Sequence, residues 1–130
     1  MRTRVWLNGC FDVLHHGHFK MIQYATGLGT DVLIGIDSDR RVKELKGENR
    51  PFHTALQRKY NLECIVGVKH VFIFDTEDQL RETIKKIEPD VFVIGSDYID
   101  KPIIGGEYAK EIKFYNRIEG LSTTKFLDDE

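Results

Sequence analysis

Residues 7–19 read LNGCFDVLHHGHF, and this stretch decides how the rest of the chain is interpreted. It begins as an apolar run, passes through Gly9, and sets His15, Gly17 and His18 where a helix is expected to begin. Gly17 has no side chain to block a close approach, and the first turn of a helix offers unpaired N–H groups and a positive dipole end. Two imidazoles three residues apart lie on one helix face, about 5–6 Å apart at Cβ. The pattern therefore indicates a site that holds a phosphate between two rings.

Two other interpretations of these histidines stay open. Histidine is only intermediate in burial, so the cluster at residues 15–18 is also compatible with a solvated loop. A zinc site could recruit Cys10 as a further ligand, but such a site needs a second ligand pair at a recognisable spacing. The other cysteine, Cys64, has no such partner in the sequence. We therefore expect no metal site built from protein ligands.

The composition is that of an ordinary globular chain without a strong charge bias. The 130 residues fit one domain, residues 1–130, and the net charge of -2 gives no general basic field for nucleic acid. Basic residues are nevertheless grouped within residues 40–59, where they either form solvated surface or surround a small polyanion. Two distant cysteines do not make a secreted disulfide framework, and neither a membrane span nor a signal-peptide apolar region is evident. We expect a cytoplasmic protein with no nucleic-acid or membrane partner.

Apolar runs alternate with segments of helical period along the chain. Strands are expected at residues 5–7, 32–36, 71–74, 91–94 and 112–115. Helices are expected at residues 17–28, from a Ser38 or Asp39 cap to Gly47, after the capping-box patterns that begin at Thr54 and Thr76, and briefly after Ser122. Strands that alternate with helices form βαβ units with right-handed crossovers. The sequence therefore predicts an α/β, Rossmann-like single domain with a five-stranded parallel sheet flanked by helices.

Polar segments follow three of the expected strands, at residues 9–18, 37–40 and 95–98. Ligands of open α/β sheets bind beyond the carboxyl ends of the strands, where the strand order reverses, so these segments should meet at one crevice. A dinucleotide fingerprint is missing, because Gly27 and Gly29 follow a helix rather than a strand, and the sequence has no Walker A lysine loop. Phosphate binding is therefore left to the histidine segment.

The segment NGCFDVLHHGH at residues 8–18, together with RIEGLSTTK at residues 117–125, resembles the cytidylyltransferase-like nucleotidyltransferases. Within that family, the resemblance is to glycerol-3-phosphate cytidylyltransferase and to the heptose-phosphate adenylyltransferases. It extends from Leu7 to about Phe126. The His-x-Gly-His motif alone is less specific, since aminoacyl-tRNA synthetases use a relative of it, but the two motifs together are specific.

The resemblance implies a role for each residue that matches a family motif. His15 and His18 would contact the nucleotide phosphates and stabilise the transition state. Lys46 would approach the reacting phosphates, and Arg58 in the QRK segment matches the arginine of the family's third motif. The remaining implied nucleotide-binding residues are Gly9, Cys10 and Phe11 in the strand-end turn, Asp97 near the base, and Arg117, Ser122, Thr123 and Thr124 around the triphosphate. A homodimer is implied as well.

The two kinds of relative imply different substrates. RIEGLSTT and FHTALQRK resemble glycerol-3-phosphate cytidylyltransferase, whereas NGCFD and LKGENRP resemble the adenylyltransferases. Cytidylyltransferases often carry threonine where Cys10 stands. We favour transfer of a nucleotidyl group from CTP to a small phosphate monoester such as glycerol 3-phosphate, with release of pyrophosphate. ATP-dependent transfer to a heptose phosphate is the alternative, and a non-catalytic nucleotide-binding module is a third.

Such a reaction needs charge stabilisation more than proton transfer. The acceptor phosphate is already ionised at neutral pH, and two unit charges ~4 Å apart repel by about 4 kcal/mol at an effective dielectric near 20. Lys46, Arg58, Arg117 and a magnesium ion are the candidates that offset this repulsion. Amides near Gly17 and Ser122 would add fixed donors.

Other conspicuous side chains are expected to be structural. Trp6 and Cys64 should lie in the core, and His53 and His70 should stabilise the fold. His16 should face away from the phosphate site.

Overall fold

The computed structural model of the protein describes residues 2–116. Its five strands, all parallel, are β1 (Arg4–Gly9), β2 (Asp31–Asp37), β3 (Val68–Phe74), β4 (Val91–Gly95) and β5 (Glu111–Tyr115). The helices are α1 (His16–Thr26), α2 (Asp39–Lys46), α3 (Ala55–Glu63) and α4 (Glu77–Ile87), with two 3-10 turns, η1 (Ser96–Tyr98) and η2 (Gly106–Tyr108), between β4 and β5. The predicted α/β, Rossmann-like architecture with a five-stranded parallel sheet is confirmed.

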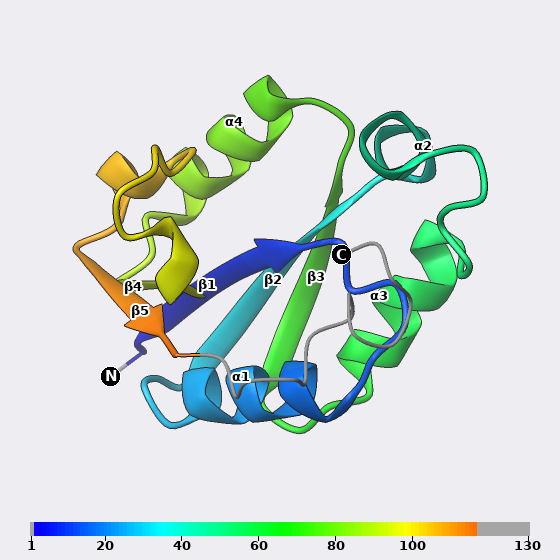
Figure 1. Cartoon of the computed structure of the whole chain (residues 1–130). Coiled ribbons are helices and arrows are strands. Elements are labelled where there is room, and N and C mark those ends of the chain that lie inside the picture. The colour runs from blue at the N-terminus through cyan, green and yellow to red at the C-terminus, as the bar shows by residue number, and fades with distance from the viewer. Residues whose placement is uncertain (1, 117–130) are drawn as a thin grey trace.

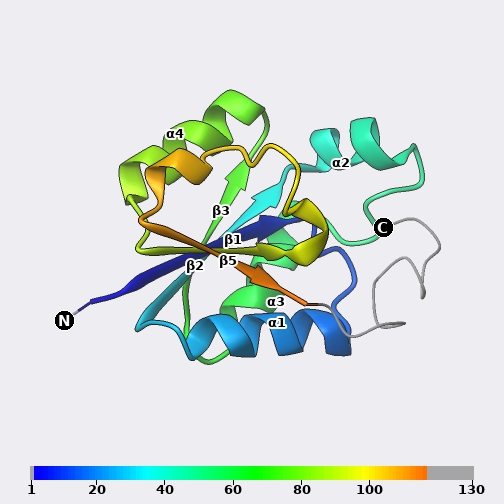
Figure 2. The ribbon, with the colours of Figure 1, turned by 60° about the vertical axis from the view of Figure 1, so that its left-hand side comes forward.

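The sheet is covered on both faces (Figure 1 and Figure 2). Helices α1 and α3 lie against one face, and α4 with the β4–β5 connection lies against the other. Successive residues of a strand point to opposite faces, so Val5 and Leu7 of β1 join the core under α1 and α3 while Trp6 joins the core under α4. Gly35 of β2 makes room for the Trp6 ring, because an added Cβ would lie 2.6 Å from it. Three consecutive buried residues of β1 thus supply both cores.

Capping residues set the helix boundaries. The hydroxyls of Ser38, Thr54 and Thr76 accept backbone N–H groups at the starts of α2, α3 and α4, as their sequence patterns predict. Gly47 ends α2 at a φ of 110°, a conformation that favours glycine. Within residues 2–116, no helix is both long enough and apolar enough to span a bilayer.

The segment between α3 and β3 differs from the prediction. The apolar stripe through Ile65 and Val66 predicts a longer helix, but α3 ends at Glu63 and Val66 is 93% exposed. Cys64, expected in the core, is exposed at the helix end. The chain turns at Gly67, which has a φ of 97°, and β3 begins at the next residue, earlier than predicted. The helix expected after Ser122 lies outside the described residues.

The strand order reverses beside β1. The order β3-β2-β1-β4-β5 places β1 at the centre, with β2 on one side and β4 on the other. The chain leaves the carboxyl ends of β1 and β4 in different directions, and such a switch point is where open α/β sheets bind ligands. The segments that follow Gly9 and Gly95 are therefore the place to look for a site.

Candidate active site

A cavity of about 360 Å³ opens at the carboxyl ends of the strands. Its polar and glycine lining includes Asn8, Gly9, Cys10, Asp37, Arg41, Lys46, Gly95, Asp97 and Tyr98. Apolar side chains of α1, α2, β3, α4, β4 and the β4–β5 connection form the remaining wall. The three polar segments thus contribute to one crevice, as the sequence predicts. Four predicted site residues line it: Gly9, Cys10, Lys46 and Asp97.

His15 and His18 build the N-terminus of α1 between them. His15 is the N-cap residue, and its Nδ1 accepts the Gly17 N–H at 3.0 Å. The Nδ1 of His18 in turn accepts the His15 N–H at 3.3 Å. This is a capping box with two imidazoles in place of the usual hydroxyl and carboxyl groups. A nitrogen that accepts a backbone N–H carries no proton, so in each neutral ring the proton is assigned to Nε2, the nitrogen that can donate.

The two rings are held against each other and against Phe11. The ring centroids of His15 and His18 are 4.0 Å apart, and those of Phe11 and His18 are 5.3 Å apart. Phe11 itself has a φ of 51°, an uncommon conformation for a bulky residue that persists only where the surrounding structure enforces it. An added Cβ at Gly9 would lie 3.2 Å from the Phe11 ring, which explains the glycine there. Local strain and close packing therefore fix the imidazole pair.

Gly17 differs from its predicted role. Its N–H was the expected amide donor to phosphate, but it already donates to His15 Nδ1. An anion at this helix end would therefore meet the Nε2–H groups of the rings rather than the Gly17 amide. His15, His18 and Phe11 are not among the residues that line the cavity, although Cys10, next to Phe11 in the chain, is.

Asp12 connects the histidine segment to the loop between α2 and α3, a role that the sequence analysis missed. Its carboxylate is 2% exposed and accepts the Arg50 Nε at 2.8 Å, the Phe52 N–H at 2.7 Å and the His53 N–H at 2.8 Å. We call the Asp12–Arg50 pair the loop clamp. Burial by itself raises the pKa of Asp12, but the hydrogen bonds from His53, Phe52 and Arg50 outweigh it and hold the pKa below its usual value. In the sequence, the available signal for this structural role of Asp12 was its position as an acidic residue within the otherwise apolar run FDVL at residues 11–14.

Arg58 lies beneath the same loop, and the expectation that it contacts phosphate needs correction. Its side chain is fully buried. It donates from Nη1 to the Cys10 carbonyl at 3.0 Å, from Nε to the His53 carbonyl at 3.0 Å, and from Nη2 to Asp39 Oδ1 at 2.9 Å. Each of the three guanidinium nitrogens thus donates to the protein, and the bond to the Cys10 carbonyl positions the strand-end turn. Its spacing of four residues from Leu62, on the buried face of α3, was the sequence signal for this placement.

Cys10 enters the cavity as a neutral thiol. Burial raises its pKa to about 11, although Arg58 and Lys46 act in the opposite direction. The thiolate is the nucleophile and the metal ligand, so the group is inert at neutral pH. Within residues 2–116, no three His, Cys, Asp or Glu side chains form a cluster that could hold a metal ion. The described part of the chain therefore lacks the ligand set that the zinc interpretation requires.

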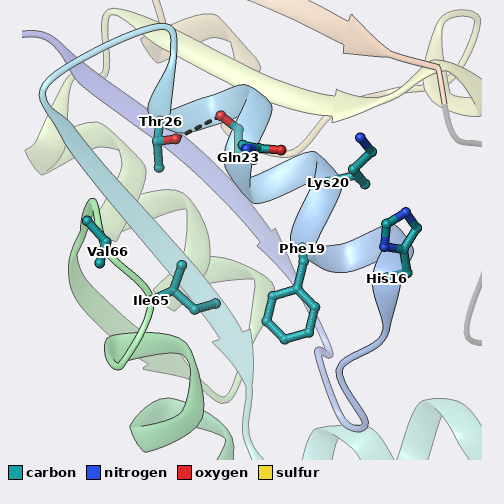
Figure 3. A pocket seen from close by; sticks show the side chains of 7 residues that line it. All are labelled: His16, Phe19, Lys20, Gln23, Thr26, Ile65 and Val66. Carbon is teal, nitrogen blue, oxygen red and sulfur yellow. Dashed lines mark hydrogen bonds between the residues drawn. The ribbon is translucent and has the colours of Figure 1, made fainter.

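A second hollow, of about 580 Å³, lies on the outer face of α1 (Figure 3). His16, Phe19 and Lys20 line it from α1, and Ile65 and Val66 line it from the turn before β3. His16 thus lines this hollow, whereas His15 and His18 do not. No residue of the imidazole pair or the loop clamp lines this hollow. Four further predicted site residues, Arg117, Ser122, Thr123 and Thr124, lie outside the described residues.

The chain matches the cytidylyltransferase-like family over residues 6–127. It is 42% identical over 127 residues to the bifunctional protein HldE of Campylobacter fetus, covering 98% of this chain and 28% of that protein. It is 43% identical over 124 residues to the bifunctional protein HldE of a Nitratiruptor species, covering 95% of this chain and 27% of that protein. The chain therefore spans little more than a quarter of the length of these relatives.

Solved structures share the fold. The lipopolysaccharide core biosynthesis protein from Thermoplasma volcanium is similar with a TM-score of 0.70 at 18% identity, covering 89% of this chain and 98% of that one. A second similar structure is that of a bifunctional NMN adenylyltransferase/ADP ribose pyrophosphatase from Francisella tularensis, complexed with AMP and a manganese ion. It has a TM-score of 0.65 at 20% identity, and the match covers 97% of this chain and 40% of that one. Given the family match over most of its length and the identity with HldE proteins, this chain belongs to the cytidylyltransferase-like family of nucleotidyltransferases.

Proposed function

We propose that this nucleotidyltransferase moves an adenylyl group from ATP to a heptose phosphate and releases pyrophosphate. This assignment reverses the preference for CTP and glycerol 3-phosphate. The HldE relatives, 42–43% identical, favour the adenylyltransferase side of the family resemblance. The observation that carries the proposal is the loop clamp: Asp12 belongs to NGCFD and Arg50 to LKGENRP, the two segments that resemble the adenylyltransferases.

The clamp explains why these two segments, far apart in the sequence, lie together at the site. The Asp12–Arg50 bond is almost entirely buried, and Asp12 also holds the backbone of the residues that follow Arg50. The loop that comes after Lys46 is therefore fixed to the turn that precedes the imidazole pair. Lys46 lines the cavity from the last residue of α2. The clamp thus ties the loop that follows this cation to the turn that precedes the rings, and alignment of reacting groups is a main source of rate in phosphoryl-transfer enzymes.

The imidazole pair supplies the electrostatic part of the mechanism. An oxygen of the acceptor phosphate attacks the α-phosphorus of the triphosphate, the bond to the β-phosphate oxygen breaks, and pyrophosphate leaves with that electron pair. His15 and His18 donate from Nε2 to the α-phosphate oxygens as charge shifts towards the leaving group. Because each Nδ1 is bonded to backbone N–H, the rings need no reorientation during the reaction.

Magnesium is the cofactor that we propose for the triphosphate. The cavity offers the carboxylate of Asp97, and residues 2–116 contain no cluster of three metal ligands. That donor set suits Mg²⁺, which usually keeps several waters and takes much of its coordination from substrate phosphates. When bound, the ion would neutralise triphosphate charge. Excess chelator should abolish turnover, and full activity in chelator would remove the ion from the mechanism.

A substrate grid tests the assignment. ATP and CTP are each combined with heptose phosphate and glycerol 3-phosphate, and pyrophosphate release is measured. We expect the ATP and heptose phosphate pair to give the highest kcat/KM. Preference for CTP with glycerol 3-phosphate would restore the cytidylyltransferase assignment, and triphosphate binding without pyrophosphate release from any pair would indicate a non-catalytic module.

Oligomeric state and location stay predictions. We propose a homodimer in the cytoplasm, as the family resemblance implies. Sedimentation equilibrium at micromolar concentration should return twice the mass of the chain, and a single-chain mass would contradict the dimer.

A further inference from the structure

The cavity contains an ion pair that the nucleotide chemistry does not use. Asp37, the last residue of β2, accepts the Nε of Arg41 at 2.8 Å, one turn into α2. Their side chains are only 13% and 19% exposed, and both line the cavity. A helix-surface pair of this spacing contributes little to stability. Its largely covered position on the cavity wall therefore points to a ligand.

The pair is held in one orientation and keeps hydrogen-bonding capacity for a ligand. The guanidinium carbon of Arg41 lies 5.5 Å from the centre of the Phe74 ring, which also lines the cavity. The bond to Asp37 uses Nε of Arg41 and Oδ1 of the carboxylate. Within residues 2–116, the structure shows no hydrogen bond from the Nη groups of Arg41 or to Oδ2 of Asp37. A fixed guanidinium beside a fixed carboxylate presents donors and an acceptor side by side.

The charge and wall of the cavity indicate the chemistry of that ligand. Arg41 and Lys46 are balanced by Asp37 and Asp97, so the lining does not favour a second polyphosphate. Beside the pair, the wall is apolar and partly aromatic, with Phe74, Leu80 and Phe92 among its residues. A hydroxyl-rich molecule that carries one phosphate fits such a lining, because its hydroxyls need both donors and acceptors while its C–H groups need apolar contact.

The strand register places this pair beside the phosphate-binding turn. Gly9 of β1 pairs with Ile36 of β2, so Asp37 and Cys10 follow at neighbouring strand ends. Adjacent strands lie about 4.8 Å apart, which is close to the width of a sugar ring. We infer that Asp37 and Arg41 are the specificity-determining pair for the acceptor and contact the hydroxyl groups of its sugar. This inference rests on the proposed function, and it identifies the acceptor's sugar, rather than the nucleotide, as the group that the pair recognises.

Steady-state kinetics of Arg41→Gln and Asp37→Asn tests the inference. Loss of a hydrogen bond to a charged group should raise the KM for heptose phosphate about tenfold to a hundredfold. The KM for ATP should stay within about twofold, because the pair does not contact the nucleotide. Arg41→Lys keeps the charge but loses the planar fork, so it should fall between the wild type and Arg41→Gln. A rise in the KM for ATP, or an unchanged KM for heptose phosphate, would overturn the inference.

Arg40→Gln is the matched control. Arg40 is the neighbouring residue of α2 and also forms ion pairs, with Glu44 and Asp75, but it is exposed and does not line the cavity. Its loss should leave both KM values unchanged. An equal rise in the heptose phosphate KM for Arg40→Gln would show that any ion pair of α2 has this effect, and would overturn the specific role.

Direct binding separates this inference from the proposed function. Titration calorimetry of heptose phosphate and of glycerol 3-phosphate, with a non-hydrolysable ATP analogue bound, compares the wild type with Arg41→Gln. We expect the wild type to prefer heptose phosphate and the variant to lose that preference. Loss of preference in a protein that shows no turnover would refute the proposed function and support the pair. Normal turnover with an unchanged preference would refute the pair alone. A wild type that binds neither acceptor would refute both the pair and the proposed function.

Discussion

Helices α1 and α4 begin in different ways. At the start of α4, the Thr76 hydroxyl accepts the Gln79 N–H, and Glu77 and Asp78 place acidic side chains in the first turn. At the start of α1, the cap is the imidazole of His15, and the first turn holds no acidic residue. The first helix follows the central strand β1 at the switch point, whereas α4 follows the edge strand β3.

The difference separates a stabilised helix end from one that is available to a ligand. A hydroxyl cap contributes about 1 kcal/mol and acidic residues in the first turn about 0.3–1 kcal/mol, so α4 is stabilised by its own side chains. The described residues give α1 no acidic compensation for its positive end. Its caps are rings that accept backbone N–H groups at Nδ1 and can donate at Nε2. The start of α1 is therefore suited to bind an anion.

Removal of the loop clamp should have the largest effect. Asp12→Ala leaves the nearly buried Arg50 without its carboxylate, and breaking such a pair costs about 3–5 kcal/mol in the free energy of unfolding. Urea denaturation monitored by circular dichroism measures this loss in the free energy of unfolding. Asp90→Ala is the control, since Asp90 also accepts a backbone N–H but is more exposed and lies at the opposite end of β1. If Asp12→Ala loses no more free energy of unfolding than Asp90→Ala, the stabilising role of the loop clamp would be contradicted.

The pH dependence of stability gives the clamp a second signature. Because the folded-state pKa of Asp12 is lowered, its contribution is present above the unfolded-state pKa and is lost as pH falls through the folded-state pKa. Asp12→Asn should flatten the acid limb of the stability curve. A wild-type curve and a variant curve of the same shape would show that Asp12 does not contribute in this way.

Loss of one imidazole of the pair should have the next largest effect. His18→Ala removes a donor to the α-phosphate, and removal of a single oxyanion donor typically lowers kcat about a hundredfold or more. Thr76→Ala removes the cap of α4 and should cost about 1 kcal/mol of stability with kcat unchanged. Pyrophosphate release and thermal unfolding measure the two effects. If His18→Ala keeps its kcat, the ring is only a cap and the two helix ends do not differ in function.

The smallest effect should come from giving α1 the acidic first turn that α4 already has. His16 is exposed at the first helical position, so His16→Glu should stabilise the fold by about 0.3–1 kcal/mol. The same charge repels a triphosphate and should raise the KM for ATP a few fold, less so at high salt. An unchanged KM at low salt would show that the nucleotide lies away from this helix end.

The sequence predicted the fold because its signals are local. Alternating apolar runs and the caps at Ser38, Thr54 and Thr76 describe strands and helices without reference to the rest of the chain. Within residues 2–116, the prediction failed near Val66 because a positive φ at Gly67 ends the apolar stripe, which the periodicity does not show.

The site was harder to predict because its contacts are long-range. The spacing of His15 and His18 indicates a ring pair, but not that each ring caps the backbone. Arg58 was expected to contact phosphate, and only the packing of α3 against the sheet shows that it bonds the carbonyl of Cys10, 48 positions away. The Asp12–Arg50 bond joins residues 38 positions apart and has no periodic signature.

The tautomers of the two rings test the central claim most directly. Long-range ¹H–¹⁵N correlation spectra report which imidazole nitrogen carries the proton, before and after addition of magnesium and a non-hydrolysable ATP analogue. We predict that His15 and His18 are protonated at Nε2 and that both Nε2 resonances shift on binding, while those of the exposed His70 do not. Protons at Nδ1, or Nε2 resonances that do not respond to the nucleotide, would contradict the account.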